Sequence, residues 1–342
     1  MVQNEIERRV PVLDETGKPG NFGWSRRPSF LYDPALIRSP RRSVCESDRY
    51  VFFSPTHLVI LEILDNGYLG YTGMSVISLK DKKRSTQAFV VPFSLGSFDL
   101  GGDSDSGTLR VERKKSALTF SAMEGGARII KADMPRFGRR RSLRGEVVFT
   151  PPAGSESLVT NMPWRRDKAA FRLSRRSPWY RAEGVIQFGA QELVFSGGNS
   201  WGIFDWNRGV RPGADVSFWA SGCGLSGGAQ AAFSIGYGSA DSSLGTENAF
   251  FLDGRLHKLD QVTFHISPFN WLLPWRFTSS DGRLEMVFAP HQERSESHQM
   301  FFHYLKRRQV FGFFSGKVIL DGGSEFEFRN IAGFAERKKT RF

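Results

Sequence analysis

The sequence predicts an all-β fold made of two consecutive antiparallel β-barrels with little helix. Strand-length apolar runs closed by Gly, Pro or Asp-Gly recur along all 342 residues. The chain has 31 Phe and 8 Trp beside 36 Gly and 16 Pro, a composition typical of many short strands separated by tight turns. Helical periodicity is nearly absent, so a closed or nearly closed antiparallel barrel, or a sandwich, is the expected architecture.

The first half begins with a proline-punctuated arm that extends to about residue 50. The apolar run 57–64 then ends in the turn Asp65-Asn66-Gly67 and resumes at Tyr68, which predicts a β-hairpin. A chain of this length usually exceeds a single core, and the change of composition over 151–166 predicts a domain boundary there. We expect residues 1–165 to form the arm and the first barrel, and 166–342 to form the second.

The second half carries clearer turn signals. Four pairs of apolar runs are joined at Gly189, Asp253-Gly254, Asp281-Gly282 and Asp321-Gly322. Asp-Gly between alternating apolar runs is among the strongest local signals for a hairpin. The best helix candidate is 292–305, and it is the only one we expect in this half.

The net charge of +12 is spread over both halves, and the densest basic run spans 136–144. Its arginines are Arg136, Arg139, Arg140, Arg141 and Arg144. Such a run is either the solvated rim of a hairpin or a surface that makes weak contact with anionic membranes. No aromatic and basic stacking signature or groove-reading helix accompanies it, so we expect no nucleic-acid partner.

Two cysteines, Cys45 and Cys223, are too few for a disulfide framework and are consistent with a reducing compartment. The most apolar early run, 51–64, is interrupted by Pro55 and Glu62, and is too short for a membrane span. Nothing resembles a secretion signal. These observations predict a cytoplasmic protein without a transmembrane segment and without a disulfide.

The stretch Ser200–Pro212 is the strongest candidate for a site, because it combines an acid, a cation and two Trp residues in a short segment. Asp205 lies between Phe204 and Trp206, and partial desolvation among aromatic rings raises the pKa of a carboxyl unless a cation offsets it. Arg208 is the nearest such cation. The pair is either a structural clamp beneath a Trp or a functional acid with its partner, and both interpretations stay open.

Other motifs predict less. The glycine-rich run 222–228 matches a dinucleotide fingerprint and a nucleophile elbow, but no helix follows it. His291, His298 and His303 lack the spacing of a zinc site, so we expect neither a metal nor a cofactor. His265, in the alternating run 262–266, is expected to point inward.

Several spaced motifs together resemble one family. They are FGWSRRP, MPW at Met162–Trp164, WGIFDWNRGVRP, FLDGRLHKLDQV, LPWRFTSSDGRLEMVFAP, VFGFFSGKVILDGG and GFAE at Gly333–Glu336. In this order they resemble the bacterial and fungal proteins of the domain of unknown function 2804, over almost the whole chain. More distantly the layout is similar to the tandem lipocalin-like (calycin-type) proteins, which include carotenoid 1,2-hydratases, AttH-type proteins and tocopherol cyclases.

The resemblance implies two lipocalin-like β-barrels and a site, but no assigned activity. The matching positions are Trp24, Arg27, Trp164, Asp205, Arg208 and Trp219. Trp201, Trp206 and His265 complete the expected ligand-binding set. One departure is Gly213-Ala214-Asp215, where the family pattern places an aromatic residue, and this change is expected to alter the mouth of the pocket.

Two functions remain as alternatives, with a third behind them. In the first, the chain is an enzyme that acts on an isoprenoid or lipid-like substrate. Asp205, assisted by Arg208, protonates the substrate, and the faces of the Trp rings stabilise the carbocation that forms. Hydration, cyclisation or isomerisation of the substrate follows. In the second, the cavity binds a hydrophobic small molecule without chemistry, as a carrier or structural protein. The third is a carbohydrate-active enzyme with Glu183 or Asp215 as a second acid. The sequence contains no signal from which an oligomeric state can be predicted.

Overall fold

The computed structural model describes residues 3–113, 115–138, 141–164, 167–300 and 303–341. These residues contain no α-helix, and only three short 3-10 turns interrupt the strands. The turns are η1 (Pro34–Leu36), η2 (Arg41–Ser43) and η3 (Glu124–Gly126). The prediction of an all-β fold with little helix is confirmed. No helix in the described part of the chain is long and apolar enough to cross a membrane.

The first sheet has 13 strands, and neighbouring strands are antiparallel. Its main path runs β7 (Arg84–Pro92), β6 (Leu69–Ser78), β5 (His57–Asp65), β4 (Glu46–Phe53), β15 (Trp201–Val210), β13 (Asp167–Phe188), β11 (Arg141–Thr150), β10 (Arg128–Phe137), β9 (Ser116–Ala122) and β8 (Thr108–Arg113). β12 (Leu158–Trp164) and β14 (Gln191–Phe195) also pair with β13, and β2 (Gly23–Ser25) pairs with β12. β1 (Val10–Pro11) and β3 (Phe30–Leu31) form a separate parallel pair.

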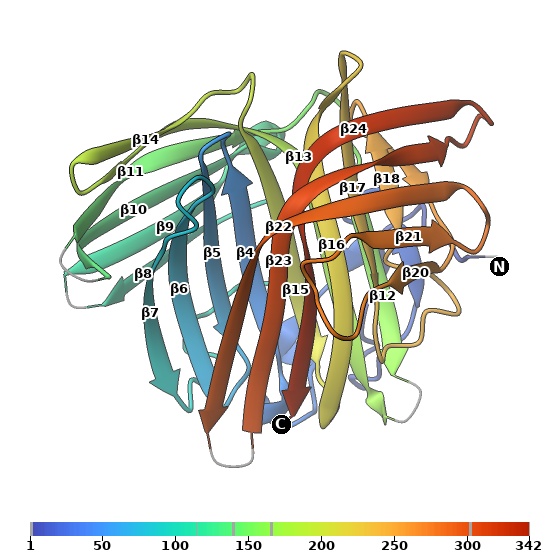
Figure 1. The fold of residues 1–342 in the computed structure, drawn as a ribbon. Helices are drawn as coiled ribbons and strands as arrows, with labels where there is room; N and C mark the ends of the chain where they lie inside the picture. Colours follow the sequence, from blue (N-terminus) through green and yellow to red (C-terminus); the bar gives the residue numbers. More distant parts are fainter. Residues whose placement is uncertain (1–2, 114, 139–140, 165–166, 301–302, 342) are drawn as a thin grey trace.

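The second sheet has nine antiparallel strands. Its order is β19 (Arg255–Lys258), β18 (Ala249–Leu252), β17 (Ala229–Tyr237), β16 (Ala214–Ser226), β24 (Glu325–Arg341), β23 (His303–Ile319), β22 (Leu284–Met300), β21 (Trp275–Ser279) and β20 (Val262–His265). Both sheets are strongly curved, and they stand side by side (Figure 1). The prediction of two consecutive antiparallel, lipocalin-like units is thereby confirmed.

The predicted hairpins are present. Asp65-Asn66-Gly67 joins β5 to β6, and the turns at Gly189, Asp253, Asp281 and Asp321 join the expected strand pairs. The expected helix over 292–305 is wrong: its described residues belong to β22 and β23, which pair with each other along their length. Residues 292–297 pair with 306–311, so cross-strand partners that lie beyond the segment outweigh its local helical pattern.

The chain passes from the first sheet to the second between Val210 and Ala214. The expected division after residue 165 therefore does not coincide with this passage, because β13, β14 and β15 complete the first sheet by pairing with β11 and β4. The Ser200–Pro212 stretch accordingly starts in the first sheet and ends at the crossing point. It does not lie within the second sheet.

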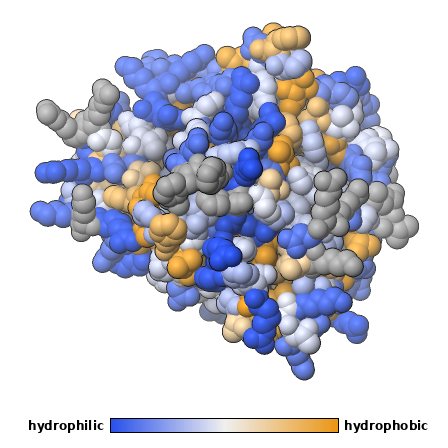
Figure 2. Space-filling model, turned by 90° about the horizontal axis from the view of Figure 1, so that it is seen from below, coloured by the Kyte–Doolittle hydropathy of each residue, from blue (hydrophilic) through white to orange (hydrophobic). Residues whose placement is uncertain are grey.

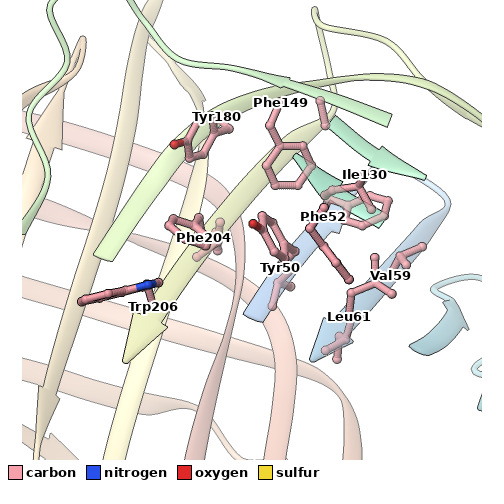
Figure 3. Packing of buried hydrophobic residues seen from close by; sticks show 14 of the residues in the cluster. Tyr50, Phe52, Val59, Leu61, Ile130, Phe149, Tyr180, Phe204 and Trp206 are labelled. Atoms are coloured by element: carbon pink, nitrogen blue, oxygen red, sulfur yellow. The ribbon is translucent and has the colours of Figure 1, made fainter. Parts of the chain in front are cut away.

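Each sheet encloses an aromatic core on its concave side. In the first, Tyr50 and Phe52 of β4 pack with Phe149 of β11 and Phe204 of β15 (Figure 3), with ring centroids 4.9 Å apart for Tyr50 and Phe204. In the second, Phe314 of β23 packs on other rings of the same sheet. Aromatic rings bury large apolar areas, so these clusters hold the curvature of the sheets.

The opposite faces of the two sheets meet at a shared junction. Because side chains alternate along a strand, Arg49 of β4 and Glu62 of β5 point away from the first core and reach β24 and β23. Trp219 and Phe334, from the second sheet, belong to the same apolar cluster as the first core. The two sheets are thus packed back to back over a mixed apolar and ionic layer.

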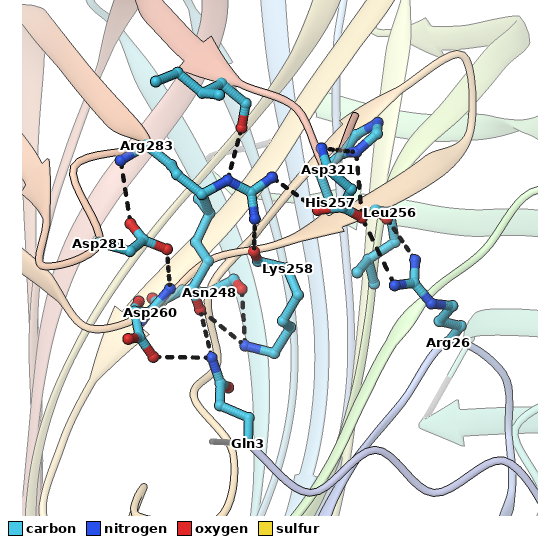
Figure 4. A network of polar contacts seen from close by, with 12 residues as sticks. Gln3, Arg26, Asn248, Leu256, His257, Lys258, Asp260, Asp281, Arg283 and Asp321 are labelled. Carbon is cyan, nitrogen blue, oxygen red and sulfur yellow. Dashed lines mark hydrogen bonds and ion pairs between the residues drawn. The ribbon is translucent and has the colours of Figure 1, made fainter. Parts of the chain in front are cut away.

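The N-terminal arm ties onto the second sheet through polar contacts (Figure 4). Gln3 donates to the carbonyl of Leu259, and Arg26 donates to the carbonyl of Leu256. The Arg26 guanidinium also lies near the carboxylates of Glu156 and Asp321. The arm therefore bridges the two sheets.

Candidate functional site

Residues 201–210 of the Ser200–Pro212 stretch form strand β15, hydrogen-bonded to β4 on one side and β13 on the other. Asp205 and Arg208 consequently lie on opposite faces of this strand. Asp205 faces the junction between the sheets, whereas Arg208 faces the interior of the first sheet with Phe204 and Trp206. The expected pairing of Asp205 with Arg208 is wrong.

Arg208 instead ties a long loop to the first sheet. Its guanidinium lies 2.8 Å from the carboxylate of Asp48 and donates to the carbonyls of Leu100 and Gly101. It also lies over the Trp206 ring, 4.4 Å from the centroid. This fully buried side chain thus joins β4, β15 and the loop at 100–101.

A cavity of about 110 Å³ lies at the junction of the two sheets. The strands β4, β5, β12, β13, β15, β16, β23 and β24 all contribute to its wall. Of the residues expected from the sequence, Asp205, Trp164 and Trp219 line it, together with part of Arg208. The cavity is therefore a product of both halves of the chain.

Asp205 is the carboxylate that distinguishes this cavity. It is 7% exposed, and burial raises the pKa of its carboxyl, an effect that Arg176 and Arg49 offset only in part. Oδ1 lies 3.0 Å from Nε of Arg176, an ion-pair distance, but the two atoms are not aligned for a hydrogen bond. A buried carboxylate oxygen without a hydrogen-bond donor is uncommon and needs an explanation.

A second carboxylate, Glu247, neutralises the arginines of β13. It contacts both Arg172 and Arg176, and accepts a hydrogen bond from Ser174. Burial alone would raise the pKa of Glu247, but the two guanidinium groups outweigh it and the pKa is lowered. Glu247 is thus held ionised while its neighbour Asp205 is pushed towards the neutral acid, which is the division of roles seen in paired catalytic carboxyls.

The indole rings contribute differently from the expectation. The guanidinium groups of Arg176 and Arg49 lie 4.0 Å and 5.3 Å from the Trp219 ring centroid, so this ring already binds two cations. Its N–H donates to Ser234. By contrast, the buried indole N–H of Trp164 has no hydrogen-bond partner among the described residues. Trp164 therefore offers the cavity a donor, whereas Trp219 acts as a platform for arginine.

Beyond Trp219 the cavity wall continues into a second ionic cluster. Arg49 donates both to Oε1 and to Oε2 of Glu336, at 2.9 and 3.0 Å, and Arg307 binds Glu62 through two hydrogen bonds. The paired arginines outweigh burial and lower the pKa of Glu62 and of Glu336. These carboxylates are fixed anions of the junction.

The remaining predicted residues lie outside the cavity wall. Trp24 is buried beneath the arm, with Arg26 and Lys258 over its ring, and Arg27 is exposed. Trp201 and Trp206 both belong to the large apolar cluster, Trp206 on the side of the first core and Trp201 on the other face of β15. The expectation that His265 points inward is wrong, because His265 is on the exposed face of β20 and contacts Thr278.

Two further predictions concern acids and basic residues. Of the two candidate second acids, Asp215 lines the cavity and Glu183 is exposed on β13. In the basic run, Arg144 pairs with Asp133, Arg141 lies over the Phe188 ring and Arg136 is exposed, while Arg139 and Arg140 lie outside the described residues. Membrane contact through this run stays a prediction.

Sequence reasoning missed the arginines and glutamates of the junction: Arg49, Glu62, Arg172, Arg176, Glu247, Arg307 and Glu336. One signal was available for part of this set. Phe171–Ser174 alternates apolar and polar residues, and so marks the start of a two-faced strand. The polar face was not identified as a site, because alternation alone does not separate a solvated face from one covered by another sheet.

In the described part of the chain, no group of three or more His, Cys, Asp or Glu side chains is placed to hold a metal ion. Cys45 and Cys223 are free thiols, and Cys45 lines the cavity.

Fold and site together define an all-β protein of two lipocalin-like sheets with a charged, aromatic-lined cavity at their junction. The chain belongs to the family described as "Domain of unknown function (DUF2804)", whose model matches residues 3–342. The family expected from the motifs is thereby confirmed. No match was found among curated proteins.

Solved structures share the fold at low sequence identity. CghA has a TM-score of 0.55 and 12% sequence identity, and the match covers 98% of this chain and 97% of CghA. The structure of CghA with Sch210972 has a TM-score of 0.54 and 12% identity, and the match covers 88% of this chain and 89% of that one. Kievitone hydratase from Nectria haematococca has a TM-score of 0.49 and 11% identity, and the match covers 86% of this chain and 88% of that one. A putative AttH from Nitrosomonas europaea has a TM-score of 0.47 and 11% identity, and the match covers 87% of this chain and 92% of that one. At these identities the likeness concerns the fold.

Proposed function

We propose that the junction cavity binds the polar end of a small, largely hydrophobic molecule and that Asp205 acts on it as a general acid. The observation that carries this proposal is the buried Asp205 carboxyl, which lines the cavity, has a raised pKa and has an oxygen without a hydrogen-bond donor. General acids raised towards neutral pH by burial are an established catalytic device.

Other unpartnered polar groups around the same cavity support binding. They include the indole N–H of Trp164, N–H groups of Arg172 and Arg176, and Oδ1 of Asp215. Buried polar atoms normally find partners, so several of them around one cavity favour a ligand that supplies hydrogen bonds. Phe171 and Trp164 provide apolar wall for the rest of the molecule.

The chemistry that fits is addition of water to a polarised double bond. The Asp205 carboxyl transfers its proton to one carbon, a water molecule forms a C–O bond to the other, and a proton of that water returns to the carboxylate. The net change is one H₂O added, and Asp205 is regenerated. Loss of a proton from carbon instead of capture of water gives isomerisation with the same residue.

The test begins with protein purified from its own host. Native mass spectrometry identifies any retained molecule, which is then incubated with the protein in H₂¹⁸O. Hydration predicts product with one ¹⁸O per turnover, and Asp205→Asn should abolish the labelling while retaining binding. Asp133→Asn, the same change at an exposed position outside the cavity wall, is the matched control and should keep the activity.

A retained molecule that is never converted would reduce the protein to a carrier. The proposal for this cavity would be overturned if the purified protein held no bound molecule, if Asp205→Asn were as stable as the wild type, and if no added ligand changed the stability of either protein.

A further inference from the structure

A second concave site opens on the other face of the second sheet, and nothing in the proposed function uses it. It is a groove of about 790 Å³, within the size range of ligand pockets. Its wall combines two kinds of side chain. The aromatic residues are Phe218, Tyr237, Phe264 and Trp271, and the basic ones that point into it are Lys306, Arg308, Arg337 and Lys339.

The groove continues the concave, core-bearing face of the sheet. Val310 of β23 and Ala335 of β24 belong to the second apolar core, and the alternate residues further along these strands are Arg308 and Arg337. The same strand face thus changes from apolar to cationic towards one end. Arg307 and Glu336 point the other way, into the junction cavity.

The register brings like charges directly opposite one another. Lys306 pairs with Lys339, and Arg308 pairs with Arg337, between β23 and β24. Directly opposite side chains have Cβ atoms about 4.5–5.5 Å apart, where like charges are destabilising. Two such pairs side by side concentrate positive charge in the groove, and a bound anion would offset the repulsion.

The neighbouring carboxylates do not supply that anion. Glu293 pairs with Arg308 at 2.6 Å, and Glu296 is taken up by Arg294 and Arg307. Among the described residues no carboxylate pairs with Lys306, Arg337 or Lys339; the two lysines lie only near the Tyr304 ring and Arg337 near Phe218. Four cations against one carboxylate leave a local charge of about +3.

Hydroxyl groups and rings complete the pattern. Ser295 and Ser297 of β22 are the cross-strand neighbours of Arg308 and Lys306 on the same face, and both line the groove. A phosphate monoester carries about −1.5 to −2 at pH 7 and accepts several hydrogen bonds from such donors. Phe264 and Trp271 are buried beside it and present apolar surface.

We propose that this groove binds an anionic amphiphile, a molecule with a phosphate-like head held by Lys306, Arg308, Arg337 and Lys339 and an apolar body lying on Phe218, Phe264 and Trp271. The groove shares Phe218 and Arg307 with the wall of the Asp205 cavity, but Asp205 does not line it, and its four cations give it a ligand chemistry of its own. Its head-group selectivity rests on charge and its preference for an amphiphile rests on the aromatic wall.

The probe is octyl phosphate below its micelle concentration, compared with inorganic phosphate and octyl glucoside. Binding is followed by titration calorimetry and by Trp fluorescence, since Trp271 lines the groove. We expect octyl phosphate to bind at least about tenfold more tightly than either comparator, because each lacks one half of the recognition, and added salt should weaken binding. If inorganic phosphate or octyl glucoside bound as tightly as octyl phosphate, the proposal that the ligand is an anionic amphiphile would be overturned.

The double variant Lys306→Gln/Lys339→Gln removes one opposed pair. Its affinity for octyl phosphate should fall by about tenfold or more. The matched control is Lys317→Gln/Arg329→Gln, on the same two strands but outside the groove, where both cations have acidic partners. It should bind like the wild type, and so should Asp205→Asn, which separates this site from the proposed catalytic cavity.

Thermal unfolding gives an independent reading. Without ligand, the Lys306→Gln/Lys339→Gln variant should melt at or above the wild-type temperature, because repulsion is relieved, and octyl phosphate should no longer stabilise it. A large loss of stability with unchanged octyl phosphate binding would show that the lysines are structural and would overturn the proposal.

Vesicles of phosphatidylcholine containing phosphatidic acid identify the source of the ligand. Vesicle binding that the double variant loses supports a membrane lipid. Binding of monomeric octyl phosphate but not of vesicles supports a soluble ligand.

Discussion

Asp205 and Glu336 are both buried carboxylates at the junction of the sheets, but their surroundings act on them in opposite directions. Glu336 receives both hydrogen bonds of Arg49 and a further one from Gln309, and its pKa is lowered despite burial. Asp205 has one poorly aligned guanidinium, and its pKa is raised. The first residue stabilises the junction as a fixed anion, and the second is the residue to which we assign the proposed acid role.

Replacing Glu336 tests the structural half of this contrast. Glu336→Gln removes the only described salt-bridge partner of Arg49, so this buried guanidinium loses its two charged hydrogen bonds. We expect a loss of about 3–5 kcal/mol in the free energy of unfolding, measured by denaturant titration. Glu325→Gln, on the same strand but in an exposed pair with Lys317, is the control and should change stability little. Equal effects would mean that the junction pair is no stronger than a surface pair.

The pH dependence of Asp205→Asn tests the other half. In the folded protein the raised pKa makes Asp205 hold its proton at pH values where the unfolded chain has released it. Its contribution to stability is therefore present at low pH and is lost as pH rises from the usual Asp range through the folded pKa. The Asp205→Asn variant has no carboxyl at this position, so it does not lose this contribution to stability as pH rises.

The measured quantity is the difference in unfolding free energy between Asp205→Asn and the wild type from pH 3.5 to about 8. It should move in favour of the variant as pH rises, and should level off above the folded pKa. A difference that moves the other way would mean that the carboxylate is stabilised by Arg176, and the acid role would fail.

At the scale of the element, β15 shows how one strand serves two regions. Its odd-numbered residues Asp205 and Asn207 face the junction cavity, and its even-numbered residues face the first core. On the core side, Arg208, Arg128 and Arg175 all bind the loop 93–107, through Leu100, Gly101, Ser104 and Asp105. The loop thus closes over the concave face of the first sheet.

Removing Arg208 should release that loop. Arg208→Met leaves the carboxylate of Asp48 and two carbonyls without their donor, and we expect a loss of several kcal/mol together with faster amide exchange in 93–107. The control is Arg27→Met, an exposed arginine that shares the family motif. If Arg208→Met lost ligand conversion while stability and loop exchange were unchanged, Arg208 would belong to the site after all.

Local turn signals explain what the sequence could predict. Asp-Gly pairs specify hairpins without help from distant residues, and each one named from the sequence is present. The segment 292–305 failed because its strand form depends on distant partners: Glu296 meets Arg307, and Arg307 meets Glu62 of the other sheet. Asp205 was found from its aromatic neighbours, but its partner Arg176 depends on the register of β13 with β15.

At the scale of the molecule, the passage between sheets does not divide the core. One apolar cluster contains Tyr50 and Phe204 of the first sheet together with Trp219, Phe251 and Phe334 of the second. The ion pairs of Arg49 and Arg307 also cross the junction. A division placed by composition, as at residue 165, misses this because the first sheet takes β13 and β15 from beyond that point.

The shared cluster predicts a single cooperative unfolding transition for both sheets. Chains of this length often unfold in steps, domain by domain, so the prediction departs from the usual behaviour. Opening either sheet alone would expose the apolar junction cluster to water and break the buried ion pairs of Arg49 and Glu62, which costs several kcal/mol. Amide exchange measured by mass spectrometry across a denaturant series should show β5 and β23 losing protection at the same midpoint. Loss of protection in β21–β23 at a clearly lower denaturant concentration than in β4–β6 would show that the second sheet unfolds on its own, and the junction would then be an interface between two independent domains.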